Sequence, residues 1–228
     1  MSDKIMRYLI PSQGPDVEAL KQCLALAVKL SQEKGFKIIT FLVPVKSNFG
    51  HSVVADLLGE KVMKALLKGQ RVKAIDDIYF ELESVKTFRE YASYELIIGF
   101  YLSQRGIDVF DSARNAKVLI FLPWLEEESK NWIDRWNPIV PGEEKSQKPS
   151  SLLGPVVEKK LKDLTAGINL STGIGHPLDK QHAKDTFAKL RSSGERFNAN
   201  DIKNWAIRNG WSPKHAEKLA KLASKYSR

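Results

Sequence analysis

The chain has 228 residues, of which 43% are apolar and 28% are charged, and its formal net charge at pH 7 is +9. This composition is typical of a folded globular protein and excludes a chain that is disordered throughout. No run of about 18 apolar residues occurs, which argues against a membrane span. No signal-peptide pattern follows Met1, so the default expectation is a cytoplasmic protein.

The single cysteine, Cys23, rules out an internal disulfide bond and a zinc knuckle. It lies within a helical pattern, and we expect it to be a small buried apolar residue.

The first 140 residues alternate between strand-like and helix-like patterns. In chain order, the strands are predicted at 5–10, 36–43, 78–82, 95–102 and 118–122, and the helices at 16–34, 52–68, 87–94 and 125–136. Strands separated by helices of this length favour right-handed βαβ units and a parallel sheet that is covered on both faces. We therefore expect a Rossmann-like or flavodoxin-like α/β domain at 1–140.

Polar residues dominate 141–150, which is predicted to be a linker. Beyond it, helices are predicted at 156–166, 179–190, 200–209 and 212–226, and a strand at 167–174 is only a weak alternative. Gly210 should end the third of these helices, and Ser212 followed by Pro213 is a typical start for the fourth. We expect a small all-α domain at 151–228 with an end that resembles a helix-turn-helix.

The positive charge is concentrated in this last part of the chain. Residues 1–140 contain 19 basic and 18 acidic side chains, residues 141–150 contain two of each, and residues 151–228 contain 15 basic and 7 acidic ones. The net charge of +8 on the C-terminal part should attract polyanions to that end of the molecule.

Lysines at helical spacing form the strongest single pattern in the chain. Together with one arginine, they are the residues that we expect to bind DNA or RNA: Arg208, Lys214, Lys218, Lys221 and Lys225. Lysine is a point charge without the planar fork of arginine, so phosphate contacts are favoured over base reading. A contact with a protein or another acidic partner, or a merely solvated helix face, would give the same pattern.

A site for a small anionic ligand is predicted where the parallel strands end, because ligands bind there in open α/β sheets. The segment 44–52 offers a lysine, hydroxyls, an amide and an imidazole ahead of a helix, whose first N–H groups favour an anion. The predicted residues are Ser12, Lys46, Ser47, Asn48, His51, Ser52 and Arg105. Neither a Gly-x-Gly-x-x-Gly nor a P-loop motif is present, so a standard dinucleotide or P-loop site is disfavoured, and the cofactor stays unknown.

Other polar patterns carry weaker interpretations. Glu81 and Glu83 share one face of a predicted strand and would suit a divalent cation, although the solvent face of an edge strand explains them better. His176 and His182 are six residues apart, a poor helical spacing for metal ligands, so no metal site is predicted. The glycines at 173 and 175 fit a turn better than a phosphate cradle.

Two hypotheses of function follow. In the first, the α/β domain senses a small anion and the basic helical domain binds nucleic acid. In the second, the α/β domain is an enzyme that acts on a nucleotide or phosphorylated substrate, and the basic domain is an accessory. The charge distribution favours the first.

Overall fold

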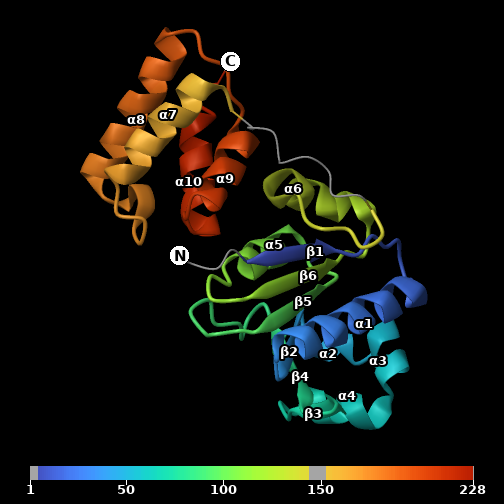
Figure 1. The fold of residues 1–228 in the computed structure, drawn as a ribbon. Coiled ribbons are helices and arrows are strands. Elements are labelled where there is room, and N and C mark those ends of the chain that lie inside the picture. Colours follow the sequence, from blue (N-terminus) through green and yellow to red (C-terminus); the bar gives the residue numbers. More distant parts are fainter. Residues whose placement is uncertain (1–4, 144–152, 228) are drawn as a thin grey trace. The chain divides into compact units, whose positions relative to one another are not determined.

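A computed structural model describes residues 5–143 and 153–227. The chain divides into two compact units, one of Met1–Ile133 with Pro138–Ser146 and one of Asp134–Asn137 with Gln147–Arg228. The predicted fold class is confirmed, because the first unit is an α/β sheet structure and the second is helical (Figure 1). Most of the linker predicted at 141–150 lies outside the described residues.

The sheet of the first unit has the strand order β1-β6-β5-β2-β4-β3. The strands are β1 (Met6–Leu9), β2 (Ile38–Val43), β3 (Val72–Ile75), β4 (Ile78–Ser84), β5 (Leu96–Phe100) and β6 (Val118–Leu122). All neighbours are parallel except β3 and β4, which are antiparallel. Strands β5 and β6 are buried along their whole length, which explains their continuous apolar sequences.

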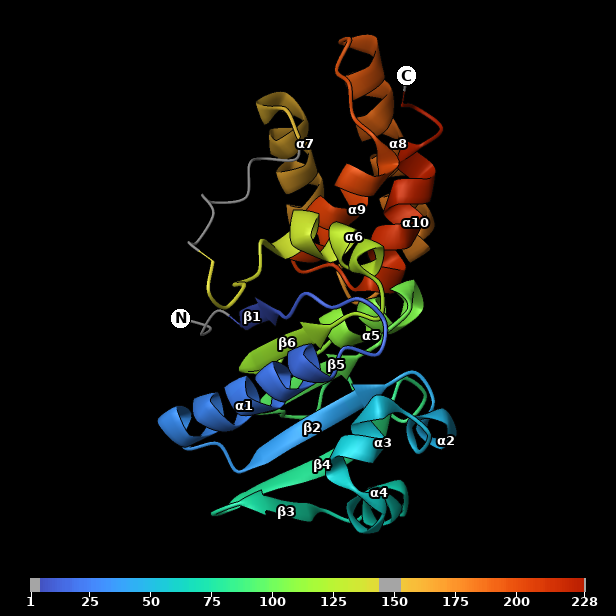
Figure 2. The same ribbon diagram turned by 90° about the vertical axis from the view of Figure 1, so that its right-hand side faces the viewer.

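Helices cover the sheet on both faces. They are α1 (Val17–Lys34), α2 (Lys46–Phe49), α3 (Val53–Leu58), α4 (Glu60–Leu67), α5 (Gln104–Asp111) and α6 (Glu126–Trp136). Helices α1, α3 and α4 lie along one face of the sheet (Figure 2). One hydrophobic cluster joins them to alternate residues of the strands, such as Phe41 and Ile98. On the opposite face, Phe110 of α5 and Trp132 of α6 pack on Phe121 of β6, with ring centroids 6.2 and 5.5 Å away.

Several predicted elements differ from the structure. The helix predicted at 52–68 is two helices, because Gly59 has φ 83° and ψ 154°, a conformation that interrupts helical hydrogen bonding. The helix predicted at 87–94 is wrong: Thr87 Oγ1 accepts from Ser84 N at 3.1 Å, and this side-chain bond closes a turn instead. The sequence patterns also did not reveal α2, α5 and the short strand β3.

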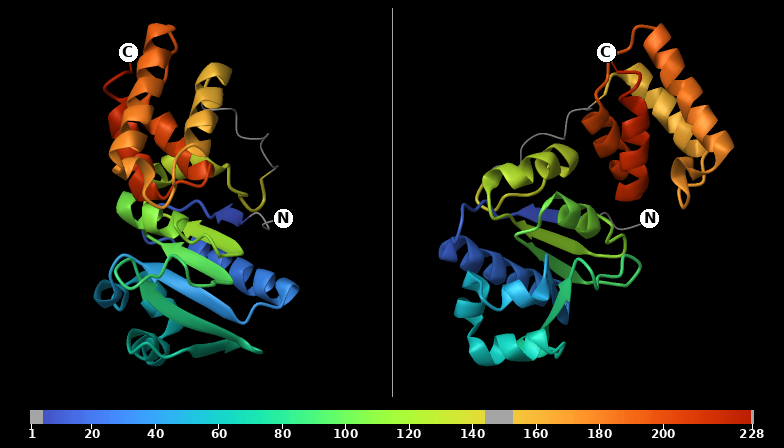
Figure 3. Two further views of the ribbon diagram at one scale, coloured as in Figure 1. Left: turned by 90° about the vertical axis from the view of Figure 1, so that its left-hand side faces the viewer. Right: turned by 180° about the vertical axis from the view of Figure 1, so that it is seen from behind.

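The second unit contains α7 (Pro155–Ala166), the short 3-10 turn η1 (Gly173–Gly175), α8 (Pro177–Ser192), α9 (Ala199–Arg208) and α10 (Pro213–Ala223). The weak strand alternative at 167–174 is therefore wrong. Trp205 and Trp211 are 4% and 2% exposed and lie in the core of this unit. Ser212 caps α10 as predicted, accepting from His215 N at 3.3 Å. Helices α9 and α10 lie side by side, in orange-red and red (Figure 3).

Candidate functional site

One half of the sheet carries polar side chains on the face opposite α1. The register of β2 with β4 places Thr40 beside Glu81 and Leu42 beside Glu83, so these side chains share that face. The connection from β4 to β5 borders a groove of about 620 Å³ over these two strands. The groove is lined by Ile38, Thr40, Lys46, Arg71, Glu81, Glu83, Thr87, Arg89, Ala92, Ser93, Tyr94 and Glu95. Its volume is within the range of small-molecule sites.

Glu81 is held in place at the floor of the groove. Thr40 is 1% exposed, and its hydroxyl donates to Glu81 Oε1 at 2.8 Å. Arg71 donates from Nε to Glu81 Oε2 at 3.0 Å, and its Nη2 lies 3.0 Å from the same oxygen. The Glu81 charge is therefore balanced by a cation and by the buried hydroxyl.

Glu83 lies two residues further along β4, on the same face of the sheet, and is held in a similar way. Lys46 Nζ lies 3.7 Å from Glu83 Oε2, and the Thr87 hydroxyl donates to the same oxygen. Both side chains of the ion pair are about 30% exposed, so the contact is open to the groove and to water. Within the described parts of the chain, the other oxygen of Glu83, Oε1, has no hydrogen-bond partner.

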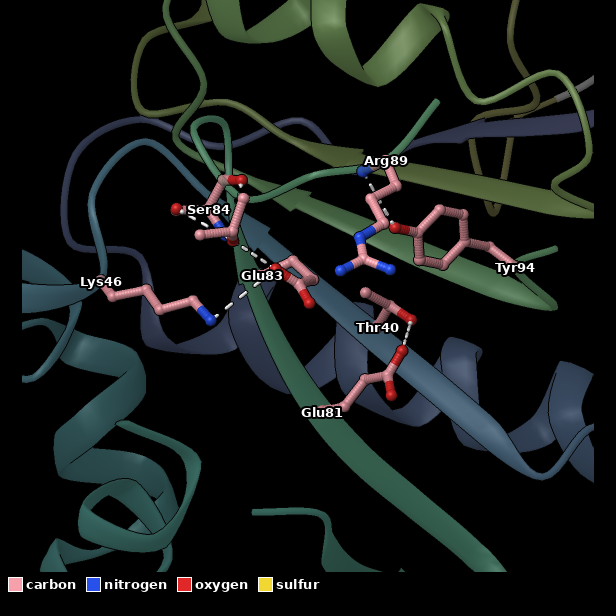
Figure 4. A network of polar contacts seen from close by, with 8 residues as sticks. Thr40, Lys46, Glu81, Glu83, Ser84, Arg89 and Tyr94 are labelled. Atoms are coloured by element: carbon pink, nitrogen blue, oxygen red, sulfur yellow. Dashed lines mark hydrogen bonds and ion pairs between the residues drawn. The ribbon is translucent and has the colours of Figure 1, made fainter. Parts of the chain in front are cut away.

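Arg89 and Tyr94 come from the connection between β4 and β5 (Figure 4). The Arg89 backbone N–H donates to the Tyr94 hydroxyl at 3.4 Å, and the Tyr94 ring stacks on Phe88 with centroids 4.8 Å apart. Burial is the main cause that raises the pKa of Tyr94, so its hydroxyl stays a neutral hydrogen-bond donor. The described residues provide no partner for the Arg89 guanidinium, which points toward the floor of the groove.

Glu95 closes the other end of the groove. Its Oε2 accepts from the backbone N–H groups of Lys37 and Ile38, at 2.7 and 2.8 Å. All three carboxylates that line the groove thus have donors already, and among the described residues Arg89 is the lining cation without an ion-pair partner.

The residues predicted for an anion site lie at several places. Lys46 begins α2 and lines the groove. The Ser47 hydroxyl donates to Asn48 Oδ1 at 3.3 Å on the same short helix, and neither residue lines the groove. Ser52 precedes α3, but its hydroxyl donates to the Phe49 carbonyl at 2.7 Å rather than capping that helix.

The other three predicted residues also lie outside the groove. His51 is exposed in the turn between α2 and α3, and Arg105 is exposed in the first turn of α5. Ser12 is buried, and its hydroxyl donates to the Pro123 carbonyl. Lys46 is therefore the predicted residue that contributes to the groove, and the assignment of the others as an anion site stays a prediction.

The edge-strand interpretation of Glu81 and Glu83 is wrong, because β3 lies outside β4 in the sheet. Both side chains are only partly exposed, since the connection that follows β4 borders their face. Within the described ranges, no group of three or more His, Cys, Asp or Glu side chains is arranged to hold a metal ion. Sequence reasoning missed Arg89 and Tyr94 because it assigned 87–94 to a helix. The available signal was the polar alternation Tyr79, Glu81, Glu83 within a strand.

The basic residues of the second unit present a second candidate surface. Lys214, Lys218 and Lys221 are exposed on α10, whereas Ala216 and Leu219 on the same helix are fully buried. At about 100° per residue, the three lysines fall within one narrow stripe. Lys225 is exposed just beyond the end of α10, and Arg208 is half-buried in the last turn of α9.

Acidic neighbours reach only part of this stripe. Glu217 Oε1 lies 3.6 Å from Lys221 Nζ, and Glu217 Oε2 lies 3.1 Å from Lys203 Nζ on α9. For Lys214, Lys218 and Lys225, the described residues include no ion-pair partner. No carboxylate of the described residues therefore neutralises these three side chains.

Comparisons with known proteins add one match. Residues 153–228 match the family model of a domain of unknown function, DUF1889. No curated protein and no solved structure matches the chain. No helix among the described residues has the length and apolar character required to cross a membrane.

Proposed function

We propose that this protein has two linked activities: the helical unit binds the phosphate backbone of a nucleic acid, and the α/β unit binds a small anionic ligand. Ligand binding to one unit would then regulate or target the nucleic-acid binding of the other. The observation that carries the proposal is the exposed row of Lys214, Lys218 and Lys221 on α10, in a region whose net charge is +8.

The packing of α10 supports this role. Its apolar residues are used by the core of the unit, so the lysine stripe is the side of the helix that faces solvent. Lysines that neutralise phosphates release counterions, and this favours binding without reading the base sequence. A protein made for base reading would place arginine, asparagine or glutamine on this helix face.

The connection between α9 and α10 also fits such a role. Asn209 to Ser212 join the two helices, and Gly210 has φ 90°, which the tight turn requires. In helix-turn-helix proteins, the second helix of such a pair enters the major groove. Helix α10 is the second helix of the pair in this chain.

The anion-binding role of the α/β unit is supported by its topology. Strands β2 and β5 are neighbours, yet β2 leads to α3 on one face of the sheet and β5 leads to α5 on the other. This is a topological switch point, where ligands of open α/β sheets bind. Lys46 and His51 follow β2, and Arg105 follows β5. The alternative, an enzyme for a nucleotide or phosphorylated substrate, stays a prediction for the same region.

The test of nucleic-acid binding uses the full chain and two matched variants. The first replaces Lys214, Lys218 and Lys221 by glutamate. The control replaces Lys159, Lys160 and Lys180 by glutamate, exposed lysines on α7 and α8 of the same unit, so both variants have the same net charge. In a gel-retardation or anisotropy titration with duplex DNA and RNA, the first variant should lose binding and the control should keep most of it. Equal losses in both variants, or binding unchanged in the first, would contradict the role of α10.

A further inference from the structure

Among the described residues, the groove over β2 and β4 contains one cation, Arg89, that forms no ion pair with a carboxylate. Its other two cations, Lys46 and Arg71, lie 3.7 and 3.0 Å from Glu83 and Glu81. Glu95 is bonded to two backbone N–H groups. The Arg89 guanidinium lines the same groove, and no partner for it is found among the described residues. A guanidinium fork is suited to bind a phosphate or carboxylate through two parallel hydrogen bonds.

Tyr94 and Glu83 determine which groups of a ligand can lie beside its anionic group. The Tyr94 hydroxyl accepts from the Arg89 backbone at 3.4 Å, so its own proton is available to a ligand oxygen. Glu83 lines the groove, and its Oε2 accepts from the Thr87 hydroxyl and lies 3.7 Å from Lys46 Nζ. Among the described residues, its other oxygen, Oε1, has no partner and is left as an acceptor. A ligand that contacts both Arg89 and Glu83 therefore needs an anionic group beside a hydrogen-bond donor such as a hydroxyl.

We infer that this groove, with Arg89, Tyr94 and Glu83 as the ligand-contacting residues, binds a small hydroxylated anion such as a sugar phosphate or a hydroxy acid. The inference rests on the proposed role of the α/β unit as an anion-binding module, and it assigns that role to the groove over β2 and β4 rather than to the strand ends. Lys46 is the one predicted strand-end residue that also lines the groove. Its volume of about 620 Å³ accommodates a molecule of this size.

The fixed carboxylates explain why the ligand should carry hydroxyl groups. Glu81 and Glu83 would repel a bare anion that came close to them, but they accept hydrogen bonds from hydroxyls. Inorganic phosphate should therefore bind more weakly than ribose 5-phosphate, and the difference should depend on Glu83.

The test is isothermal titration of the full chain with inorganic phosphate, ribose 5-phosphate and gluconate as probes. Arg89→Gln should weaken the binding of the hydroxylated probes at least about tenfold, as expected for the loss of a charged hydrogen bond. The matched control is Lys86→Gln, which removes the same charge from an exposed residue of the same connection outside the groove. It should leave the affinity within about twofold, as for a solvent-screened charge.

Two further variants separate the groove from the strand-end site. Glu83→Gln should reduce the preference for ribose 5-phosphate over inorganic phosphate. Arg105→Gln tests the strand-end site instead. If Arg105→Gln abolishes binding while Arg89→Gln does not, the assignment of the anion site to the groove is wrong, and the anion binds at the strand ends. If none of the probes binds the unmodified chain at millimolar concentration, the inference that the groove binds a small hydroxylated anion is wrong. The nucleic-acid role is then tested by the lysine variants alone.

Discussion

The carboxylate of Glu217 on α10 contacts the ammonium group of Lys203 on α9, with 3.1 Å between Oε2 and Nζ. The Lys203 side chain is only 12% exposed, whereas that of Glu217 is 42% exposed. Because the two residues belong to different helices, this ion pair ties α9 to α10 beside the lysine stripe. It also places one negative charge next to Lys221, at 3.6 Å.

The first prediction concerns stability and pH. The hydrogen bond from Lys203 is the main cause that lowers the pKa of Glu217 from its usual 4.5. A lowered pKa in the folded state stabilises the protein above the unfolded-state pKa, and this contribution is lost as the pH falls below about 4.5. Glu217→Gln should reduce the free energy of unfolding at pH 7 by about 0.5–1 kcal/mol, since the glutamate is partly exposed.

Urea unfolding at pH 7 and at pH 3 measures this effect. The difference between the original chain and Glu217→Gln should be present at pH 7 and should shrink at pH 3. The control is Glu60→Gln, which removes a fully exposed partner of Lys64 within α4 and should not change stability measurably. A difference that is equal at both pH values would argue against an ionic contribution.

The same substitution should strengthen nucleic-acid binding. Glu217→Gln removes the negative charge beside Lys221, so the potential of the stripe becomes more positive. At about 0.1 M salt, where exposed charges are partly screened, we expect an increase in affinity of about twofold. Anisotropy titrations with a duplex should detect it, and a decrease in affinity would indicate that the stripe is not the contact surface.

Salt dependence gives a third prediction. If Lys214, Lys218 and Lys221 each neutralise one phosphate, their replacement by alanine should reduce the slope of log K against log salt by about 2–3 for duplex DNA. The measurement is a titration series between about 50 and 200 mM salt, the range in which counterion release is normally resolved. An unchanged slope with weaker binding would mean that the lysines act without touching the backbone.

Two neighbouring glycines provide a fourth prediction. Gly173 has φ +56°, and a Cβ added to it would lie 2.7 Å from the Cβ of His215. Gly175 has nothing within 4 Å of such a Cβ. Gly173→Ala should therefore destabilise the protein by about 1–3 kcal/mol, the range for a strained backbone. Gly175→Ala should change stability by less than about 0.5 kcal/mol. Thermal or urea unfolding compares the two, and equal effects would contradict the close contact with His215.

The fifth prediction concerns Cys23. Its thiol is fully buried in α1, and burial raises its pKa well above the usual range. Since the thiolate is the reactive form, an aromatic disulfide reagent at pH 8 should label the native protein very slowly. The labelling rate in increasing urea should rise together with unfolding measured by circular dichroism. Rapid and complete labelling in the absence of urea would contradict the burial.

The sequence by itself determined much of the framework. Buried parallel strands have continuous apolar sequences, so 118–122 was predicted with the bounds of β6. Helix caps are local, so Ser212 could be recognised at the start of α10, where its hydroxyl accepts from His215 N. The uneven charge distribution is a property of composition and needs no coordinates.

The tertiary structure alone decided where the polar side chains meet. The groove depends on the register that places Thr40 beside Glu81, and on a turn at Ser84 and Thr87 that the helical pattern of 87–94 concealed. The break of the helix at Gly59 and the position of β4 inside the sheet were likewise decided by the tertiary structure. Periodicity reports which face of an element is buried, but strand order and register arise from contacts between residues far apart in the chain, and a single sequence does not display these.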